Sequence, residues 1–145
     1  MQHVITTYKM SRIVQVLGSC CIPSLVEFYQ PEFILFPPGF DAHYNDPLAH
    51  MKLTTRMIRY VAEYIHNAVH TWSGGQLGVL STGGYDANAF GWGIGTILSV
   101  LTGLKYSPPK QTPPFEDDAE TWDIVRSNVQ EVKEMVFPAL GVNVM

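Results

Sequence analysis

The chain has 145 residues, a net charge of −4, and 46% hydrophobic but only 15% charged residues. Its length suits one domain with its own core, and its Lys and Arg residues are scattered, which excludes the basic patch of a nucleic-acid-binding protein. No run of about 18 apolar residues is present to span a membrane, and residues 1–10 lack the order of a signal peptide. We therefore expect a soluble intracellular protein, cytoplasmic by default, without direct membrane or nucleic-acid contacts.

The first third of the chain predicts one helix and one strand. Residues 1–18 show no strong period and are poorly defined, whereas residues 19–29 have the pattern of a helix. The adjacent Cys20 and Cys21 disfavour an ordinary disulfide and indicate a reducing compartment. The continuous apolar run at residues 33–36 has the length of a strand and no alternation, so it predicts a central parallel strand covered by helices on both faces.

The rest of the chain predicts helices around a second strand. We expect an amphipathic helix at 54–70, capped by Thr54 or Thr55, and then a strand at 76–81. A helix at 87–103, ended by Gly103, and a proline-rich connection at 106–117 should follow. The last element is an amphipathic helix at 118–137, which has on one side Trp122, Val125, Val129, Val132 and Val136. Strands that alternate with helices predict a parallel α/β sheet. Two strands are too few for such a sheet, so we expect part of a larger domain.

Four potential metal ligands follow the first strand, namely Asp41, His43, Asp46 and His50. Ligands of parallel sheets collect at the carboxyl ends of strands, and Asp and His side chains suit zinc, iron, manganese or cobalt. Each residue also has a plain structural interpretation. Asp41 suits a turn or cap, the two histidines suit surface or structural positions in the loop, and Asp46 before Pro47 suits a turn that it shapes itself, which we favour for Asp46.

The second strand ends in the sequence TGGYD. Gly83 and Gly84 let the backbone turn tightly, and Tyr85 can donate a hydrogen bond from its hydroxyl to a developing oxyanion. The alternative for this tyrosine is a core residue at a strand-to-helix turn. His66 and His70 share one helix face at i and i+4, but no Glu lies between them as in metalloproteases, so we expect them to face solvent.

The segment PEFILFPPGFDAHYNDPLAHMKLT, followed by GGYD, resembles the histone deacetylase superfamily of zinc-dependent amidohydrolases, which includes acetoin-utilisation proteins and acetylpolyamine amidohydrolases. The resemblance covers about residues 19–137. It implies the C-terminal portion of a three-layer, arginase-like parallel-sheet fold that is truncated at its N-terminal side. It also implies an acetylated lysine or polyamine substrate and one Zn²⁺ ion. Site roles would be a metal ligand at Asp41, a catalytic hydroxyl at Tyr85, channel lining at Gly83 and Gly84, and loop shaping at Asp46.

The chain also departs from this family. The Asp-x-His segment and paired histidines that supply the family's other ligands and its general acid and base precede the region of resemblance and are missing here, and Thr82 stands where many bacterial-type members have Glu. One carboxylate and one tyrosine cannot form a three-ligand site with a general base, so we expect the isolated chain to be a poor deacetylase or none.

Three alternatives stay open. In the first, the chain is a gene-model fragment, or it is half of a split enzyme that a partner chain completes. Another possibility is a non-enzymatic interaction module that uses an exposed sheet edge and apolar patch. The third is a small self-contained metal site built from the four ligands of the first loop, completed across a homodimer.

Overall fold

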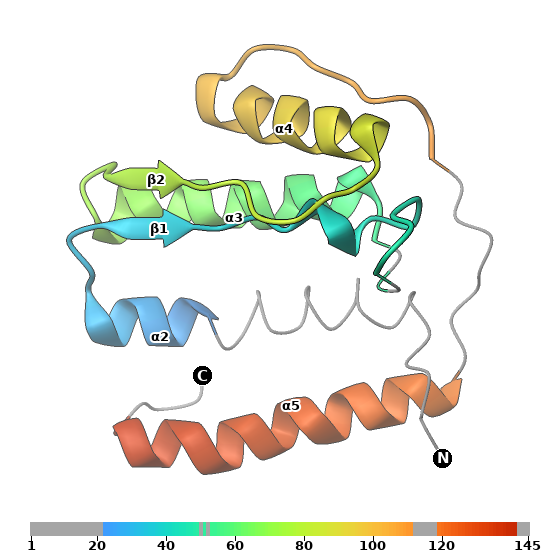
Figure 1. Cartoon of the computed structure of the whole chain (residues 1–145). Helices are drawn as coiled ribbons and strands as arrows, with labels where there is room; N and C mark the ends of the chain where they lie inside the picture. The colour runs from blue at the N-terminus through green and yellow to red at the C-terminus, as the bar shows by residue number, and fades with distance from the viewer. Residues whose placement is uncertain (1–21, 50, 52, 112–118, 142–145) are drawn as a thin grey trace.

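The computed structural model describes residues 22–49, 51, 53–111 and 119–141 (Figure 1). Its elements are, in chain order, α2 (Ile22–Tyr29), β1 (Ile34–Phe36), the 3-10 helix η2 (Phe40–Ala42), α3 (Thr55–Trp72), β2 (Leu77–Val79), α4 (Ala87–Thr102) and α5 (Ala119–Leu140). The expected order of helices and strands is confirmed. The expectations for residues 1–18, for the two cysteines and for His50 fall outside the described residues. None of the described helices is long and apolar enough to cross a membrane.

β1 and β2 form a parallel pair, which confirms the predicted α/β arrangement. Ile34 lies opposite Leu77, and α3 forms the crossover between the two strands. Hydrogen bonding continues past the strand ends, because the N–H of Leu80 donates to the carbonyl of Phe36 and that of Thr82 to the carbonyl of Pro38, both at 3.1 Å. The two chain segments therefore run side by side until their loops begin.

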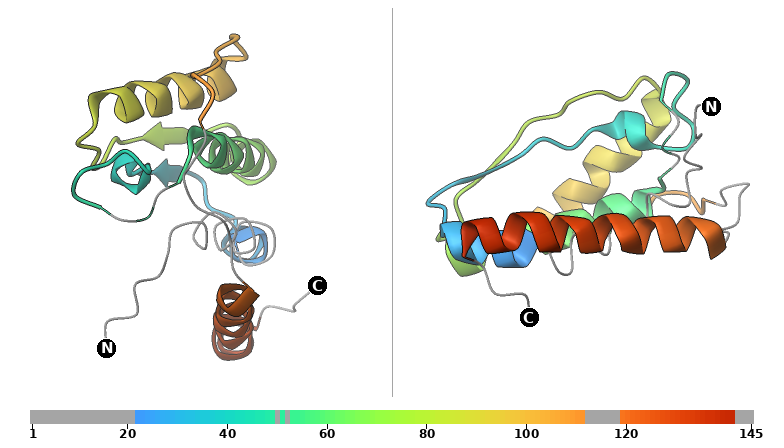
Figure 2. Two further views of the ribbon diagram at one scale, coloured as in Figure 1. Left: turned by 90° about the vertical axis from the view of Figure 1, so that its right-hand side faces the viewer. Right: turned by 90° about the horizontal axis from the view of Figure 1, so that it is seen from below.

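The core lies between the strands, α3 and α4, with Phe40 at its centre. Phe40 is fully buried and clusters with Ala62 of α3 and Ile97 of α4. Gly93 lies so close to the Phe40 ring that an added Cβ would overlap it. α3 runs alongside the strands, and α4 packs on α3 beyond β2 (Figures 1 and 2). The residue that precedes Asp41 is thus fixed in the core.

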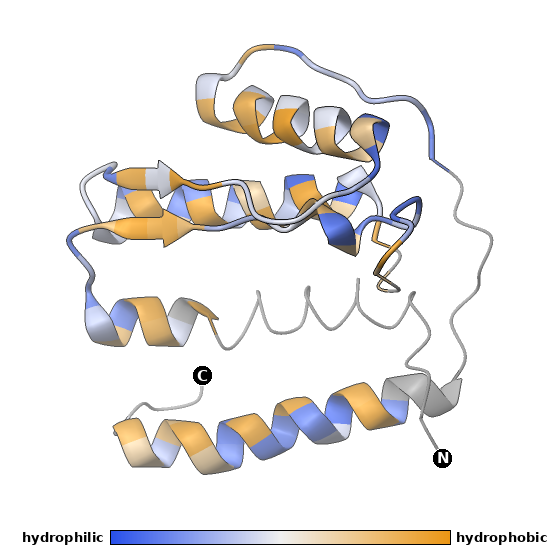
Figure 3. Cartoon of the chain, viewed as in Figure 1, coloured by the Kyte–Doolittle hydropathy of each residue, from blue (hydrophilic) through white to orange (hydrophobic). Residues whose placement is uncertain are grey.

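The opposite face of the two strands is open among the described residues, so within them the prediction that helices cover both faces of the first strand was wrong. Phe33 is 54% exposed, Leu35 58% and Leu80 57%. Burial alternates along β1, because the helices of the described chain pack only on the side of Ile34 and Phe36. β1 is nevertheless hydrophobic along its whole length (Figure 3).

α4 is held by a cap at each end. The Asp86 side chain accepts a hydrogen bond from the Ala89 N–H at 2.7 Å, and Gly103 ends the helix in a left-handed conformation with φ of +71°, as its position predicted. In the middle of the helix, the Tyr106 ring lies against Gly95, where an added Cβ would be 2.7 Å from the ring. The segment after α4 therefore folds back onto it.

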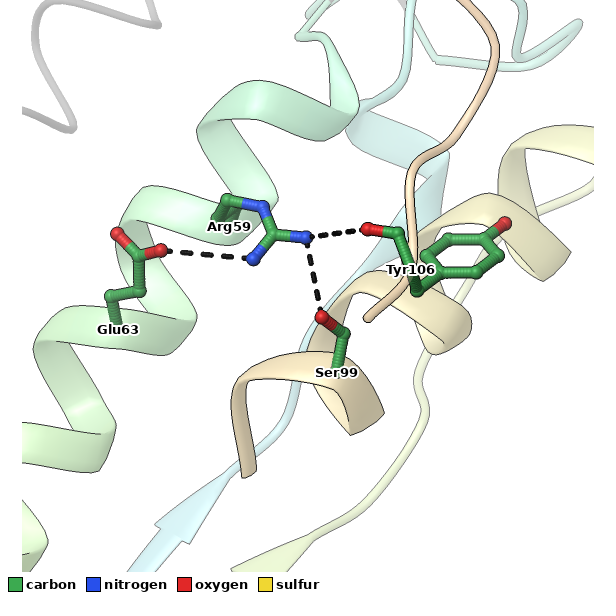
Figure 4. A network of polar contacts seen from close by, with 4 residues as sticks. All are labelled: Arg59, Glu63, Ser99 and Tyr106. Carbon is green, nitrogen blue, oxygen red and sulfur yellow. Dashed lines mark hydrogen bonds and ion pairs between the residues drawn. The ribbon is translucent and has the colours of Figure 1, made fainter. Parts of the chain in front are cut away.

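Arg59 of α3 ties this returning segment to both helices (Figure 4). Its Nη2 donates to the Ser99 Oγ at 3.4 Å and to the Tyr106 carbonyl at 3.1 Å, while its Nη1 lies 3.7 Å from Glu63. The proline-rich connection is extended as expected over its described part, to residue 111. The contact directs residues 104–111 toward the N-terminus of α3.

α5 lies on the far side of α2 from the strands (Figures 1 and 2). It runs past its expected end to Leu140 and contains Pro138 in its last turn. Val125, Val129 and Phe137 are buried on one side. Val132 and Val136, predicted for the same side, are 39% and 37% exposed, so the apolar stripe is narrower than its sequence suggested.

Candidate active site at the strand ends

The loops after the two strands meet at the Asp41 carboxylate. Gly39 and Thr82 form an isolated parallel bridge, and Asp41 follows in η2. A methyl group built on Gly83 would lie 2.7 Å from the Asp41 Cγ, and one on Gly39 would lie 2.7 Å from its Oδ1. Gly83 also has a φ of +63°, which other residues rarely adopt. Glycine at both positions makes room for this carboxylate.

The Asp41 carboxylate is half-buried and has no hydrogen-bond or ion-pair partner within the described ranges. A carboxylate that caps a turn uses its oxygens to accept backbone N–H groups. Within the described residues Asp41 accepts no such N–H, although a turn or cap was its plain interpretation. The described residues therefore leave both of its oxygens without a partner.

Asp46, in contrast, uses both of its oxygens. Its Oδ1 accepts from the Leu48 N–H at 2.9 Å and the Ala49 N–H at 3.0 Å, the pattern of an aspartate that shapes its own turn. Its Oδ2 accepts from the Tyr85 N–H at 2.8 Å. Burial alone would raise the pKa of the Asp46 carboxyl, but these three N–H groups and nearby His43 hold that pKa below its ordinary value of 3.8. This carboxylate joins the two loops and is committed to that role.

Tyr85 is 62% exposed, so its interpretation as a core tyrosine was wrong. Its backbone is nevertheless held on both sides. Asp46 binds its N–H, and the next residue, Asp86, caps α4. Gly84 has a φ of +109° and lies against Phe40, where an added Cβ would be 2.8 Å from the Phe40 Cβ. A fixed backbone thus carries a phenol that faces solvent.

His43 is buried, at 1% exposure, and the interpretation of it as a surface loop residue was wrong. Its Nδ1 accepts a hydrogen bond from the Asn45 N–H at 3.2 Å, which leaves the proton on Nε2 to bind the Gln111 Oε1 at 3.3 Å. The ring also contacts Tyr44 and Trp92, with centroids 4.5 Å and 5.9 Å away. Both ring nitrogens are therefore occupied, and His43 is a structural residue of the loop.

Gln111 is the contributor that sequence reasoning missed. Its Oε1 also accepts from the Thr55 N–H at 2.9 Å, which satisfies a free donor at the start of α3. Thr54 is the N-cap residue, but its side chain makes no capping hydrogen bond. Gln111 thus joins the loop after β1, through His43, to the start of α3, although it lies in a distant part of the chain. No motif around it signals this contact.

Comparison with known proteins shows the family. A family model described as "Histone deacetylase domain" matches residues 4–101, which is more than half of the chain. The chain belongs to the histone deacetylase family. The resemblance to this family that the PEFILFPPGFDAH segment indicated is therefore confirmed.

The histone deacetylase family proteins that match this chain are longer than the chain itself. It is 29% identical over 92 residues to a "Probable deacetylase" of Methanothermobacter thermautotrophicus, covering 63% of this chain and 26% of that protein. It is 35% identical over 73 residues to a "Histone deacetylase-like amidohydrolase" of Pseudomonas aeruginosa, covering 50% and 19%. The crystal structure of the HDA15 HD domain superposes with a TM-score of 0.65 at 18% identity, over 90% of this chain and 33% of that domain. The chain thus spans about a quarter or less of the two curated relatives and a third of the HDA15 domain.

The self-contained metal site is not formed by the described residues of this family chain. Across those residues, no group of three or more His, Cys, Asp or Glu side chains is placed to hold a metal ion. His43 and Asp46 use their potential ligand atoms in hydrogen bonds. The rings of His66 and His70 pack with centroids 4.6 Å apart, and His70 lies beside Gly75 at the start of β2, at the other end of the sheet from Asp41. His70 is exposed as expected, and His66 is half-buried.

Because His43 is buried, we expect the folded chain to become less stable as the pH is lowered. Burial lowers the pKa of His43 from its ordinary value of 6.5, against the opposing effects of Gln111, Asp86 and Asp46. Below pH 6.5 the unfolded chain therefore binds a proton that the folded chain resists. The free energy of unfolding should fall by up to about 1.4 kcal/mol per pH unit on this account.

Urea denaturation between pH 7.5 and 5 measures this slope. The matched variant His43→Gln does not titrate, so it should be less stable at pH 7.5 but show a flatter pH dependence than the wild-type chain. Equal slopes in the two proteins would contradict the assignment of the proton uptake to His43.

Proposed function

We propose that this chain contributes Asp41 and Tyr85 to a zinc-dependent amide hydrolase site that acts on an acetylated lysine or polyamine, and that the isolated chain is inactive. One observation carries the proposal. The half-buried Asp41 carboxylate has no partner among the described residues and lies against Gly83, in the loop that leads to Tyr85. Membership of the histone deacetylase family supports this assignment.

The described residues of this chain do not fit a complete zinc site. A catalytic zinc takes three protein ligands and keeps one open position. Asp41 supplies one carboxylate, and the described residues place no group of three ligands together. We therefore propose that the remaining ligands and the general base come from polypeptide outside the described residues.

The Tyr85 loop offers the chemistry that this chain can supply itself. An exposed phenol on a fixed backbone can donate a hydrogen bond to the oxyanion that develops from an amide carbonyl. Gly83 and Gly84 precede it with left-handed φ values and no side chains, which supports their proposed role as the lining of a narrow acyl channel.

A partner polypeptide is part of the proposal. The open sheet face exposes Phe33, Leu35 and Leu80, and an apolar face of this kind marks an interaction surface. The matched relatives are several times longer than the segments that align with this chain. This supports the proposal that a further part of the same domain covers the open face. The same surface is what a non-enzymatic interaction module would use, so that alternative also remains a proposal.

A chimera separates these possibilities. Residues 32–103 replace the corresponding strand–helix–strand–helix segment of the Pseudomonas amidohydrolase. The chimera, the parent and the isolated chain are assayed for acetyl-lysine hydrolysis with added Zn²⁺. We expect turnover by the parent and chimera only. Asp41→Asn in the chimera should abolish turnover and lower the bound zinc, because it removes a charged ligand. The isolated chain, but not the chimera, should bind a hydrophobic dye.

Two outcomes would overturn the proposal. Turnover by the isolated chain that Asp41→Asn abolishes would show that the chain is active alone. A folded, zinc-loaded chimera without turnover would show that these residues cannot complete a deacetylase site, and would favour the interaction module.

A further inference from the structure

We infer that Asp46 is a positioning residue that sets the place of Tyr85 relative to Asp41. The inference rests on the proposed function for the catalytic role of the tyrosine, but its structural part stands on the hydrogen bonds of the Asp46 carboxylate. One oxygen shapes the loop that follows Asp41, and the other binds the Tyr85 N–H at 2.8 Å.

The Tyr85 loop needs such an anchor because its own backbone is permissive. Gly83 and Gly84 both adopt positive φ, and glycine has the largest freedom to leave such a conformation. The Tyr85 side chain is 62% exposed, so packing does little to hold it. The bond from Asp46 is the hydrogen bond that the Tyr85 N–H makes within the described chain. Its acceptor is ionised, which makes the bond stronger than one between neutral groups.

The anchor comes from the loop that also carries the proposed ligand. Asp46 is 8% exposed and lies five positions after Asp41, whose neighbour Phe40 is fixed in the core. If the Tyr85 backbone moved away from Asp41, the buried Asp46 carboxylate would lose one of its three hydrogen-bond donors. His43 and Asp86 are the other titratable groups nearby, and the first is buried and the second is engaged as a helix cap.

Asp46→Asn tests this link with little other change. The asparagine oxygen can keep the two bonds to Leu48 and Ala49, while its NH₂ group then faces the Tyr85 N–H and cannot accept from it. In the ¹⁵N-labelled full chain at neutral pH, we expect amide hydrogen exchange at Tyr85 to become about tenfold faster or more, with Leu48 and Ala49 unchanged. The control Asp86→Asn removes a charge beside Tyr85 but keeps a good capping group, so exchange at Tyr85 should stay as in the wild type.

Unchanged exchange at Tyr85 in Asp46→Asn would overturn the inference, and equal acceleration at all three amides would show that Asp46 only supports its own loop. The active chimera adds a catalytic measurement, in which Asp46→Asn should lower kcat about tenfold with KM unchanged, but should add little further loss when Tyr85→Phe is already present. An unchanged kcat there would also overturn it. A chimera without activity would refute the proposed function, while the exchange data would still decide whether Asp46 holds Tyr85.

Discussion

Replacing Phe40 with alanine should lower the free energy of unfolding by about 3–5 kcal/mol, the usual loss for a large aromatic removed from a core. Phe40 is fully buried between Ala62 and Ile97, and its ring packs edge-on to Phe90 with centroids 5.2 Å apart. Gly93 lies directly against the ring, so the helix backbone cannot easily move in to fill the space. The loss is a large part of the 5–15 kcal/mol typical of a whole domain.

Urea denaturation followed by circular dichroism measures this loss. Phe33→Ala is the matched control, because it removes the same ring from a side chain that is 54% exposed. A surface substitution of this kind should change stability by about 0.5 kcal/mol. Similar losses in the two variants would show that Phe40 is not the centre of the core.

The sequence predicted the helices and the meeting of the two loops because these follow from local signals. The three-and-four spacing of apolar residues gave α3, and Gly103 marked the end of α4. Two apolar runs joined by a helix imply parallel strands, and parallel strands bring their carboxyl ends together. Asp41 and the Gly83 loop were therefore expected at one edge of the sheet, and the structure places them in contact there.

The parts that could not be predicted depend on distant contacts. His43 and Gln111 are 68 positions apart, and neither has a motif that indicates a bond between them. The burial of His43 depends on this pairing and on Trp92 from another helix. The open face of β1 was missed for a related reason, since an apolar run shows that a strand suits burial but not which surface covers it.

The difference between Asp41 and Asp46 shows how far the structure sharpens the site. In the sequence they are two carboxylates of one loop, and only the Pro47 that follows Asp46 favoured a turn-shaping role for it. In the structure Asp46 has three backbone donors, whereas Asp41 has no partner among the described residues. A carboxylate whose two oxygens both accept hydrogen bonds is a poor candidate for a ligand, so the proposed metal role falls to Asp41 on physical grounds as well as by family resemblance.

Tyr85→Phe in the active chimera should lower kcat by about 10²–10³, the usual loss for one oxyanion donor, with KM nearly unchanged. The substitution removes only the phenol oxygen from an exposed side chain, so folding and bound zinc should stay as in the parent chimera.

The control Tyr29→Phe belongs in a variant of the isolated chain, because position 29 lies outside the grafted segment. Its side chain is 63% exposed against 62% for Tyr85, so the two substitutions remove the same oxygen from equally exposed rings. Both should leave the stability of the isolated chain unchanged, which separates the kinetic effect of the Tyr85 hydroxyl from any effect on folding. An undiminished kcat in Tyr85→Phe would remove this hydroxyl from the reaction. A loss of zinc together with kcat would instead indicate that the substitution disturbs the Asp41 loop, which Asp46 joins to Tyr85.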